Sequence, residues 1–294
     1  MTEARSESRV APPVQVRGAV WSTSRVGAYH HLTLVAPGIA EHARPGQFVA
    51  LAVGGPDTGL LLRRAFSIYR VSTRGVYGGT VEIVFAARGA GTRWLASQQQ
   101  HAAVDVVGPL GRPFALPRTD SGPASATLVG GGYGSAPLFA LAEALLARGS
   151  RVDFVLGAGS ADRLFGALDA KRMASTVAVT TDDGSTGTRG RVTDVLPAVL
   201  QRAATDVVYA CGPMAMLRAV TAVATAHGVP AQCAVEESMA CGIGVCMTCV
   251  LPVVGDDGVT RMVRSCVEGP VFLGDRVRWD DIGTVPADAH GAPR

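Results

Sequence analysis

Four cysteines near the carboxyl terminus constrain this chain more than any other feature. Cys241, Cys246 and Cys249 follow the spacing C-x4-C-x2-C, and Cys266 comes sixteen residues later. This spacing is typical of a plant-type [2Fe–2S] cluster, whose two irons take four thiolates. Two glycines between the first pair permit the positive φ that a tightly wrapped loop requires. The sequence therefore predicts an iron–sulfur centre with these four cysteines as its ligands.

A structural zinc site is the main alternative for these thiols. Zinc sites more often repeat C-x2-C pairs or include histidine, and no histidine lies between residues 228 and 289. The spacing therefore favours iron, and a zinc-stabilised nucleotide-binding regulator is the less favoured interpretation. Cys211 and Cys233 fall outside the pattern, and we expect Cys233 to be a small buried apolar residue.

Composition argues against several other classes of protein. The 294 residues carry 27 basic and 24 acidic side chains, a balance that does not indicate nucleic-acid binding. No apolar run approaches the roughly 18 residues that a membrane span needs, and the polar start of the chain is unlike a signal peptide. We expect a cytoplasmic protein, in which clustered thiols stay reduced and bind metal. Residues 1–13 are expected to be disordered.

Residues 14–117 show short apolar runs broken by turn residues, the pattern of a small antiparallel barrel. The six expected strands are VQVRGAVWS, YHHLTLVA, QFVALAV, RAFSIYRV, GGTVEIVFAA and HAAVDVVGPLG, with one short helix in GTRWLASQ. In the fourth strand Arg64 could clamp a phosphate through its planar fork, and Ser67 could bond a flavin ring edge. Taken alone, an arginine on a barrel is more often a solvated surface group.

A glycine-rich turn about twenty residues later strengthens the interpretation of that strand. In ARGAGTRWLA, Gly89 and Gly91 precede Thr92 and a short helix. Such a turn presents free backbone N–H groups to a phosphate, although an ordinary turn with Thr92 as N-cap would look the same. Together the two segments predict a pyrophosphate site on the barrel.

After residue 117 strands and helices alternate, which predicts a doubly wound parallel sheet over residues 118–232. The first unit, TLVGGGYGSAPLFALAEAL, is a strand, a turn and a helix. Gly130, Gly131, Gly132 and Gly134 in this turn would let the pyrophosphate of a nicotinamide dinucleotide approach the helix N-terminus. A tight turn without a ligand is the alternative.

A second predicted contact with NAD lies at the end of the strand TDVVYA. Cys211, Gly212 and Pro213 follow that strand, at the edge where open α/β sheets bind ligands. The small thiol could touch a nicotinamide ring.

Charged residues follow two further strands of this sheet. Asp162 and Arg163 stand side by side after the second strand, where an acid favours NAD and an arginine favours NADP. Asp182 and Asp183 lie in a later loop, where either could bond a ribose or simply cap the turn. These residues leave the choice of nicotinamide nucleotide open.

In chain order these segments resemble the ferredoxin–NADP reductase superfamily. Within it, about residues 14–278 resemble the family of dihydroorotate dehydrogenase electron transfer subunits. The resemblance implies a multidomain β and α/β fold: an FAD-binding barrel over 14–117, an NAD-binding domain over 118–232 and a small [2Fe–2S] domain over 233–294. The FAD contacts that it implies are Arg64, Ala65, Phe66, Ser67, Val84, Phe85, Ala86, Gly91 and Thr92.

The chain departs from the family at one position, because Ala65 stands where the family's R-P-x-S motif has proline. The resemblance also implies a partner. This is a catalytic subunit that binds FMN and oxidises dihydroorotate, in a heterotetramer of two plus two, for pyrimidine biosynthesis. NAD⁺ would then be the final electron acceptor.

The expected cofactors suit an oxidoreductase that relays electrons. An iron–sulfur cluster carries single electrons, nicotinamide takes a hydride, and a flavin does both. We therefore expect the order FMN, [2Fe–2S], FAD and NAD⁺, with no catalytic acid–base residue and no dihydroorotate site on this chain. A reductase subunit for another flavoprotein, of the sulfide dehydrogenase or transhydrogenase kind, is the alternative.

Overall fold

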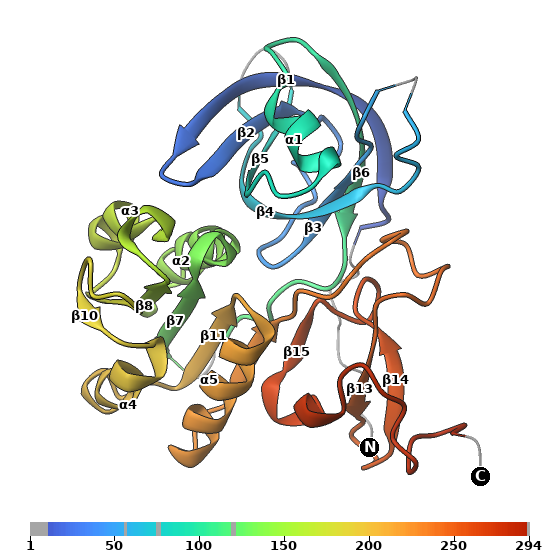
Figure 1. Ribbon diagram of the computed structural model, residues 1–294. Helices are drawn as coiled ribbons and strands as arrows, with labels where there is room; N and C mark the ends of the chain where they lie inside the picture. Colours follow the sequence, from blue (N-terminus) through green and yellow to red (C-terminus); the bar gives the residue numbers. More distant parts are fainter. Residues whose placement is uncertain (1–10, 56–57, 75–77, 119–121, 293–294) are drawn as a thin grey trace.

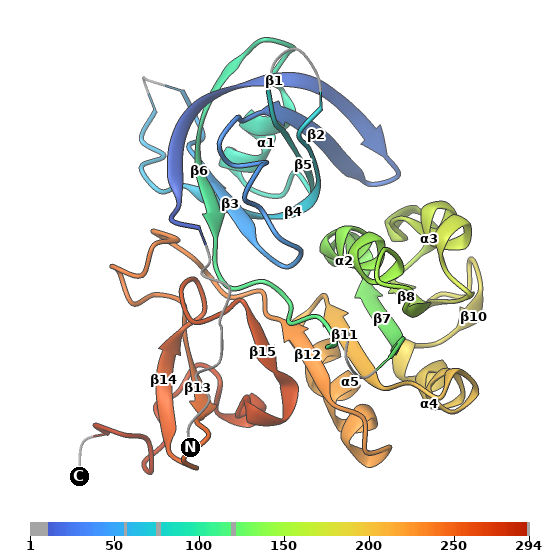
Figure 2. The ribbon, with the colours of Figure 1, turned by 180° about the vertical axis from the view of Figure 1, so that it is seen from behind.

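The computed structural model describes residues 11–55, 58–74, 78–118 and 122–292. Figures 1 and 2 show a barrel above, an α/β domain beside it and a carboxyl-terminal segment below, all three meeting at the centre. The disorder expected for residues 1–13 falls mostly on residues outside the described ones. No helix in the described part of the chain is both long and apolar enough to cross a membrane.

The first domain is a closed antiparallel barrel, which confirms the predicted architecture. Its strands, in the spatial order β1-β2-β5-β4-β3-β6, are β1 (Val14–Val26), β2 (Tyr29–Val35), β5 (Thr80–Phe85), β4 (Arg64–Ser72), β3 (Phe48–Leu51) and β6 (Ala103–Leu110). Apolar residues at every second position of these strands face the barrel interior, as Leu32 and Leu34 on β2 do. The reason is that neighbouring residues of a strand face opposite sides. Helix α1 (Ala90–Ala96) lies against one end.

The second domain is a parallel sheet covered on both faces, also as predicted. Its elements are β7 (Ser125–Gly131), η2 (Gly132–Ser135), α2 (Pro137–Leu146), β8 (Arg151–Ala158), η3 (Ala161–Arg163), α3 (Ala167–Met173), β9 (Thr176–Thr181), β10 (Thr188–Arg189), α4 (Val192–Ala203), β11 (Val207–Cys211), α5 (Met214–Ala226) and β12 (Ala231–Ala234). Helices α2 and α3 pack on one face, and α4 and α5 pack on the other. The strands are therefore apolar throughout rather than alternating.

The carboxyl-terminal segment belongs partly to that sheet. Strands β13 (Val250–Val254) and β14 (Thr260–Arg264) form a separate hairpin, followed by β15 (Val271–Leu273) and the short turns η4 (Gly274–Arg276) and η5 (Trp279–Asp281). Strand β15 pairs antiparallel with β12, so the full sheet order is β10-β9-β8-β7-β11-β12-β15. One sheet thus takes strands from both sides of residue 233, and the domain boundaries drawn from sequence stay predictions.

Aromatic rings hold the barrel against the α/β domain. Tyr69 of β4 meets Phe139 of α2 and Phe165 edge to face, with ring centroids 5.7 and 5.4 Å apart. Such pairs contribute about 0.5–1.5 kcal/mol each beyond the burial of their area. At the edge of this contact the Tyr29 hydroxyl donates to the Arg163 carbonyl at 2.7 Å. The two domains therefore have a fixed relative position.

Candidate functional site

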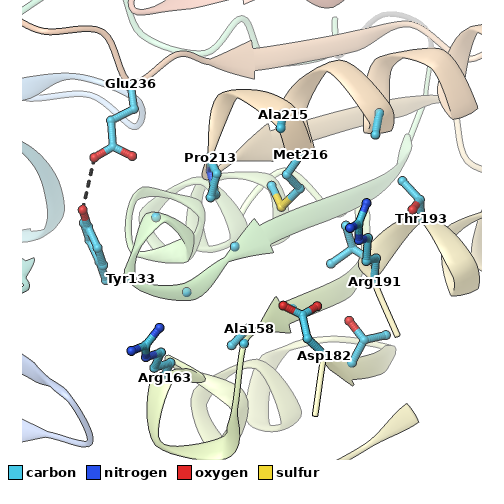
Figure 3. Close-up of a pocket in the computed structure, with 18 of the residues that line it drawn as sticks. Tyr133, Ala158, Arg163, Asp182, Arg191, Thr193, Pro213, Ala215, Met216 and Glu236 are labelled. Atoms are coloured by element: carbon cyan, nitrogen blue, oxygen red, sulfur yellow. Dashed lines mark hydrogen bonds between the residues drawn. The ribbon is translucent and has the colours of Figure 1, made fainter. Parts of the chain in front are cut away.

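The first candidate cavity lies where the order of the parallel sheet changes direction. From β7 the chain adds β8 and β9 on one side and β11 and β12 on the other, and ligands of open α/β sheets bind at such switch points. A cavity of about 580 Å³ opens there, at the carboxyl ends of these strands (Figure 3). Pro137 opens α2, where its missing N–H leaves no helical bond unmade.

Two turns approach each other so closely at this point that only glycine fits. A Cβ on Gly134 would lie 2.8 Å from the Gly212 Cα, and one on Gly212 would lie 3.1 Å from the Gly131 Cα. Both distances are shorter than ordinary contacts of a Cβ atom with backbone. The absence of side chains here brings the ends of β7 and β11 together and leaves their backbone facing the cavity.

The expected NAD residues distribute over two neighbouring cavities. Gly131, Gly132 and Pro213 line the first cavity, and Gly134 lines both. Cys211 and Gly212 line only the second. Gly130 lines neither, because it packs against the turn itself, where an added Cβ would meet the Ser135 side chain. Burial raises the pKa of the Cys211 thiol, so it remains a neutral group and no nucleophile.

The second cavity, of about 430 Å³, lies between the barrel and the α/β domain. All nine residues expected to contact FAD line it: Arg64, Ala65, Phe66, Ser67, Val84, Phe85, Ala86, Gly91 and Thr92. The Arg64 guanidinium donates to the Leu62 carbonyl at 2.7 Å, which holds it at the mouth. The Thr92 hydroxyl accepts the Arg88 and Gly89 N–H groups, both at 3.0 Å. The cavity is lined mostly by apolar side chains with a few polar groups, a lining that suits a flavin ring.

The two cavities share one wall. Arg88, Tyr133, Gly134 and Glu236 line both of them. The Tyr133 hydroxyl donates to Glu236 at 3.1 Å (Figure 3), and the Arg88 guanidinium carbon lies 5.9 Å from the tyrosine ring. Burial raises the pKa of Tyr133 to about 12, so its hydroxyl stays protonated at neutral pH. Ligands in the two cavities would be separated only by these side chains.

Three of the four predicted cluster cysteines lie on one loop before β13, Cys266 lies in the turn after β14, and the four form two pairs. Contacts join Cys246 to Cys241 and Cys266 to Cys249. Among the described residues no three His, Cys, Asp or Glu side chains gather closely enough to hold one metal ion. Two pairs suit a [2Fe–2S] centre, in which each of two irons takes two protein ligands, better than a zinc ion that takes four.

Hydrogen-bond donors face these sulfurs. The Val245 N–H donates to the Cys241 sulfur at 3.3 Å, and Gly244 donates from its backbone to Cys266. Hydrogen bonds from Thr248 lower the pKa of Cys246 to about 6. Gly244 has a φ of 84°, a conformation that favours glycine. The donor set therefore fits an anionic iron–sulfur group.

One of the two cysteine pairs lies against strand β3 of the barrel, which contributes Phe48 to the flavin cavity. Cys249 and Cys266 are buried against Phe48 of β3, and Phe48 also lines the flavin cavity. Met239 packs on the same group and lines the same cavity. Two apolar side chains thus stand between the thiols and the proposed flavin.

Several of these residues carry no signal in the sequence that marks them as functional. Tyr133 lies within the glycine-rich turn, where the pattern points to the glycines rather than to the tyrosine. Glu236 follows β12 at the same edge of the sheet as Cys211, a position that could have marked it. Phe48 and Met239 had no sequence signal, because their role depends on a contact between distant segments.

Comparisons with known proteins agree with this arrangement. Residues 236–278 match the iron-sulfur cluster binding domain of dihydroorotate dehydrogenase B, and residues 128–222 match an oxidoreductase NAD-binding domain. The chain is 40% identical over 248 residues to the electron transfer subunit of dihydroorotate dehydrogenase B (NAD(+)) from Bacillus caldolyticus, covering 84% of this chain and 92% of that one. The chain belongs to this family of electron transfer subunits.

Other members of the family and a solved structure extend the comparison. The Geobacillus kaustophilus subunit is 40% identical over 250 residues, 84% of this chain and 92% of that one. A structure of the NADH-dependent reduced ferredoxin-NADP oxidoreductase, described for flavin-based electron bifurcation, superimposes with a TM-score of 0.77. It is 29% identical, and the match covers 91% of each chain. The family assignment confirms the function predicted from sequence, that of an oxidoreductase electron transfer subunit.

The contact between the two glycine turns generates a prediction for this electron transfer subunit. Replacing Gly212→Ala should push the ends of β7 and β11 apart, because the added Cβ meets the Gly131 backbone. We expect NADH affinity to fall about ten-fold or more, since small displacements at a binding turn are costly, and flavin content to fall as well, because Gly212 itself lines the flavin cavity. Gly59→Ala is the matched control, because no atom of a described residue lies within 4 Å of its Cβ position. Titration of each variant with NADH measures the effect, and wild-type affinity in Gly212→Ala would contradict it.

Proposed function

We propose that this chain connects three sites in a row: a cysteine-held cluster, a flavin and a nicotinamide nucleotide. One observation carries the proposal. The flavin cavity shares Phe48 and Met239 with the cysteine pairs on one side, and shares Tyr133 and Glu236 with the nucleotide cavity on the other. A flavin in the middle cavity would therefore have Phe48 and Met239 between it and the cysteine pairs, and would share the wall of Tyr133 and Glu236 with the nucleotide.

Each proposed group has its own set of residues. Cys241, Cys246, Cys249 and Cys266 would hold the [2Fe–2S] cluster. The stretch from Arg64 to Ser67, the stretch from Val84 to Ala86, and Gly91 with Thr92 would hold FAD. Gly131, Gly132, Gly134 and Pro213, which line the nucleotide cavity, would hold NAD, and Cys211 and Gly212 would lie on the flavin side of the same turns. Once bound, the cluster supplies single-electron transfer, the flavin one- or two-electron exchange, and nicotinamide hydride acceptance.

The protein's own contribution is orientation and exclusion of water. Hydride exchange requires alignment of two rings rather than a proton donor. The Tyr133 hydroxyl stays protonated and donates to Glu236, so this tyrosine presents an uncharged side chain to the flavin cavity. Cys211 contributes a small uncharged side chain to the same cavity.

The electron donor is proposed to be a separate catalytic subunit that carries FMN and oxidises dihydroorotate in the cytoplasm. The family name supports such a partner, and an assembly of two plus two chains is our expectation. The cysteine loop offers a docking surface: Ile243, Val245 and Met247 are 52%, 75% and 53% exposed around the exposed Cys246. Three exposed apolar side chains on one loop favour a protein contact over solvent.

A reductase subunit for a different flavoprotein is the second candidate. The likeness to the NADH-dependent reduced ferredoxin-NADP oxidoreductase favours it. The two candidates differ in the donor that the assembled complex accepts. If the assembled complex reduces NAD⁺ with electrons from dihydroorotate, the first candidate is supported. If dihydroorotate does not serve as the electron donor and NADPH does, the second candidate is supported.

Removal of one cysteine tests the cluster assignment. Cys246→Ser should lower iron and acid-labile sulfide well below two per chain and remove the broad visible absorption of the cluster, because one iron loses half of its protein ligands. Cys233→Ser is the matched control, since that thiol is buried between β12 and α5, with its sulfur 3.4 Å from the Thr221 hydroxyl. Full iron content in Cys246→Ser, or zinc in place of iron in the wild type, would contradict the assignment.

A charge on the exposed loop tests the docking surface. Val245→Asp should reduce dihydroorotate-dependent NAD⁺ reduction by the reconstituted complex about ten-fold or more, because a buried apolar contact becomes an unpaired charge. Oxidation of NADH by ferricyanide and the iron content should stay at wild-type values. Val285→Asp, at another exposed position, is the control. Equal activity of the two variants would rule out this surface.

A further inference from the structure

An arginine connects the cysteine loop to the hairpin that follows it. Arg264 is the last residue of β14, two positions before Cys266, and its side chain is half-buried. One nitrogen of its guanidinium donates to the Gly244 carbonyl at 3.0 Å, and another donates to the Glu268 carboxylate at 2.7 Å. The side chain therefore joins the strand to the middle of the loop that carries three of the cysteines.

Glu268 holds this arginine in place through both of its carboxylate oxygens. One oxygen accepts the guanidinium, and the other accepts the backbone N–H of Arg264 at 3.1 Å. Two arms of the guanidinium are thus engaged at once, a forked geometry that arginine provides and lysine does not. The loop is tightly packed here, because a Cβ on Gly244 would lie 2.5 Å from the Val267 side chain and 3.4 Å from a guanidinium nitrogen of Arg264.

The peptide unit that Arg264 contacts also donates to a cysteine sulfur. Its carbonyl, on Gly244, accepts from the arginine. Its N–H, on Val245, donates to the Cys241 sulfur at 3.3 Å. The Gly244 backbone donates in turn to Cys266. These two residues therefore give a hydrogen bond to one cysteine of each pair, and the arginine holds them by the carbonyl between.

A cation on the carbonyl strengthens the N–H donor of the same peptide. Hydrogen bonds in a chain polarise one another, and those made by a charged group are stronger than neutral ones. The reduction potential of an iron–sulfur cluster depends on the hydrogen bonds to its sulfurs. A reduced cluster carries one more negative charge than an oxidised one, so stronger donors and a nearby cation favour the reduced form. The charge of Arg264 also interacts with Cys249 and Cys266.

We propose that Arg264 is a positioning residue that raises the reduction potential of the cluster through the Gly244–Val245 peptide. Its fork holds this peptide toward Cys241 and makes the bound cluster easier to reduce. The inference rests on the proposed function, because it requires the four cysteines to hold a [2Fe–2S] group. If the ion pair with Glu268 only anchored the loop, removal of either partner would have the same effect.

The test measures the reduction potential of the cluster in the full chain, by redox titration followed by electron paramagnetic resonance. In Arg264→Gln the equilibrium should shift about ten-fold or more toward the oxidised cluster, a fall of about 59 mV for a one-electron couple. Glu268→Gln removes a negative charge, and its amide oxygen can still accept from the arginine, so the potential should not fall. Arg264→Lys keeps the charge without the fork, and its potential should lie between those of wild type and Arg264→Gln.

Arg261→Gln is the matched control. Arg261 lies on the same strand and pairs with Asp257, also four positions away and at 2.7 Å, but toward the other end of the hairpin. This variant loses a comparable ion pair and should keep the wild-type potential and iron content.

A wild-type potential in Arg264→Gln, or an equal fall in Glu268→Gln, would overturn the proposal while leaving the cluster assignment in place. If Arg264→Gln does not retain iron, Arg264→Lys decides: a lower potential supports the proposal, and a wild-type potential overturns it. Loss of the cluster from both variants would assign the arginine to anchoring and overturn the proposal as well. A wild-type chain that holds no iron would instead show that the proposed function is wrong.

Discussion

The edge-to-face contact between Tyr69 of the barrel and Phe139 and Phe165 of the α/β domain holds together the two domains that form the flavin cavity. Neither domain alone forms the flavin cavity, because its lining combines barrel residues such as Ser67 with Gly212 from the α/β domain. Electron and hydride transfer both require close approach. A hinge at this interface would separate the proposed redox groups. The aromatic contact therefore keeps the distance between these groups short.

The carboxyl-terminal segment is held in place by a different interaction, the hydrogen bonds between strands of the sheet. Strand β15 extends the sheet by pairing with β12, and the chain between β12 and β15 then carries the cysteine loop onto β3 of the barrel. Cys249 and Cys266 therefore pack in one cluster with Phe48. This order of attachment places the cysteine loop beside the flavin cavity, which Phe48 also lines, and leaves Val245 of that loop exposed.

The features that sequence predicted best are local ones. The spacing from Cys241 to Cys249 and the glycine turn at 130–134 encode loop geometry within a few residues, so they could be interpreted without a structure. Strand and helix patterns gave the barrel and the parallel sheet, and family resemblance supplied the nine residues that line the flavin cavity. The pairing of β15 with β12 has no local signal, because a three-residue strand is too short to show one.

The residues that sequence could not predict depend on distant contacts. Tyr133 and Glu236 are 103 positions apart and meet only through the fold. Asp162, Asp182 and Asp183 all follow strands and look alike in sequence, and only the structure shows that Asp182 alone of the three lines the nucleotide cavity. Phe48 and Met239 are ordinary core residues by composition, and their position between thiols and flavin cavity follows from the docking of the cysteine loop on the barrel.

The central claim, that one chain joins cluster, flavin and nicotinamide, is tested most directly by adding NADH anaerobically to the purified subunit without its partner. Visible absorption reports the flavin, and low-temperature electron paramagnetic resonance reports the cluster. The account predicts that NADH bleaches the flavin and that the signal of a reduced [2Fe–2S] cluster then appears. A bleached flavin beside a cluster that stays oxidised, in a chain with two irons, would contradict the claim that the three sites are connected.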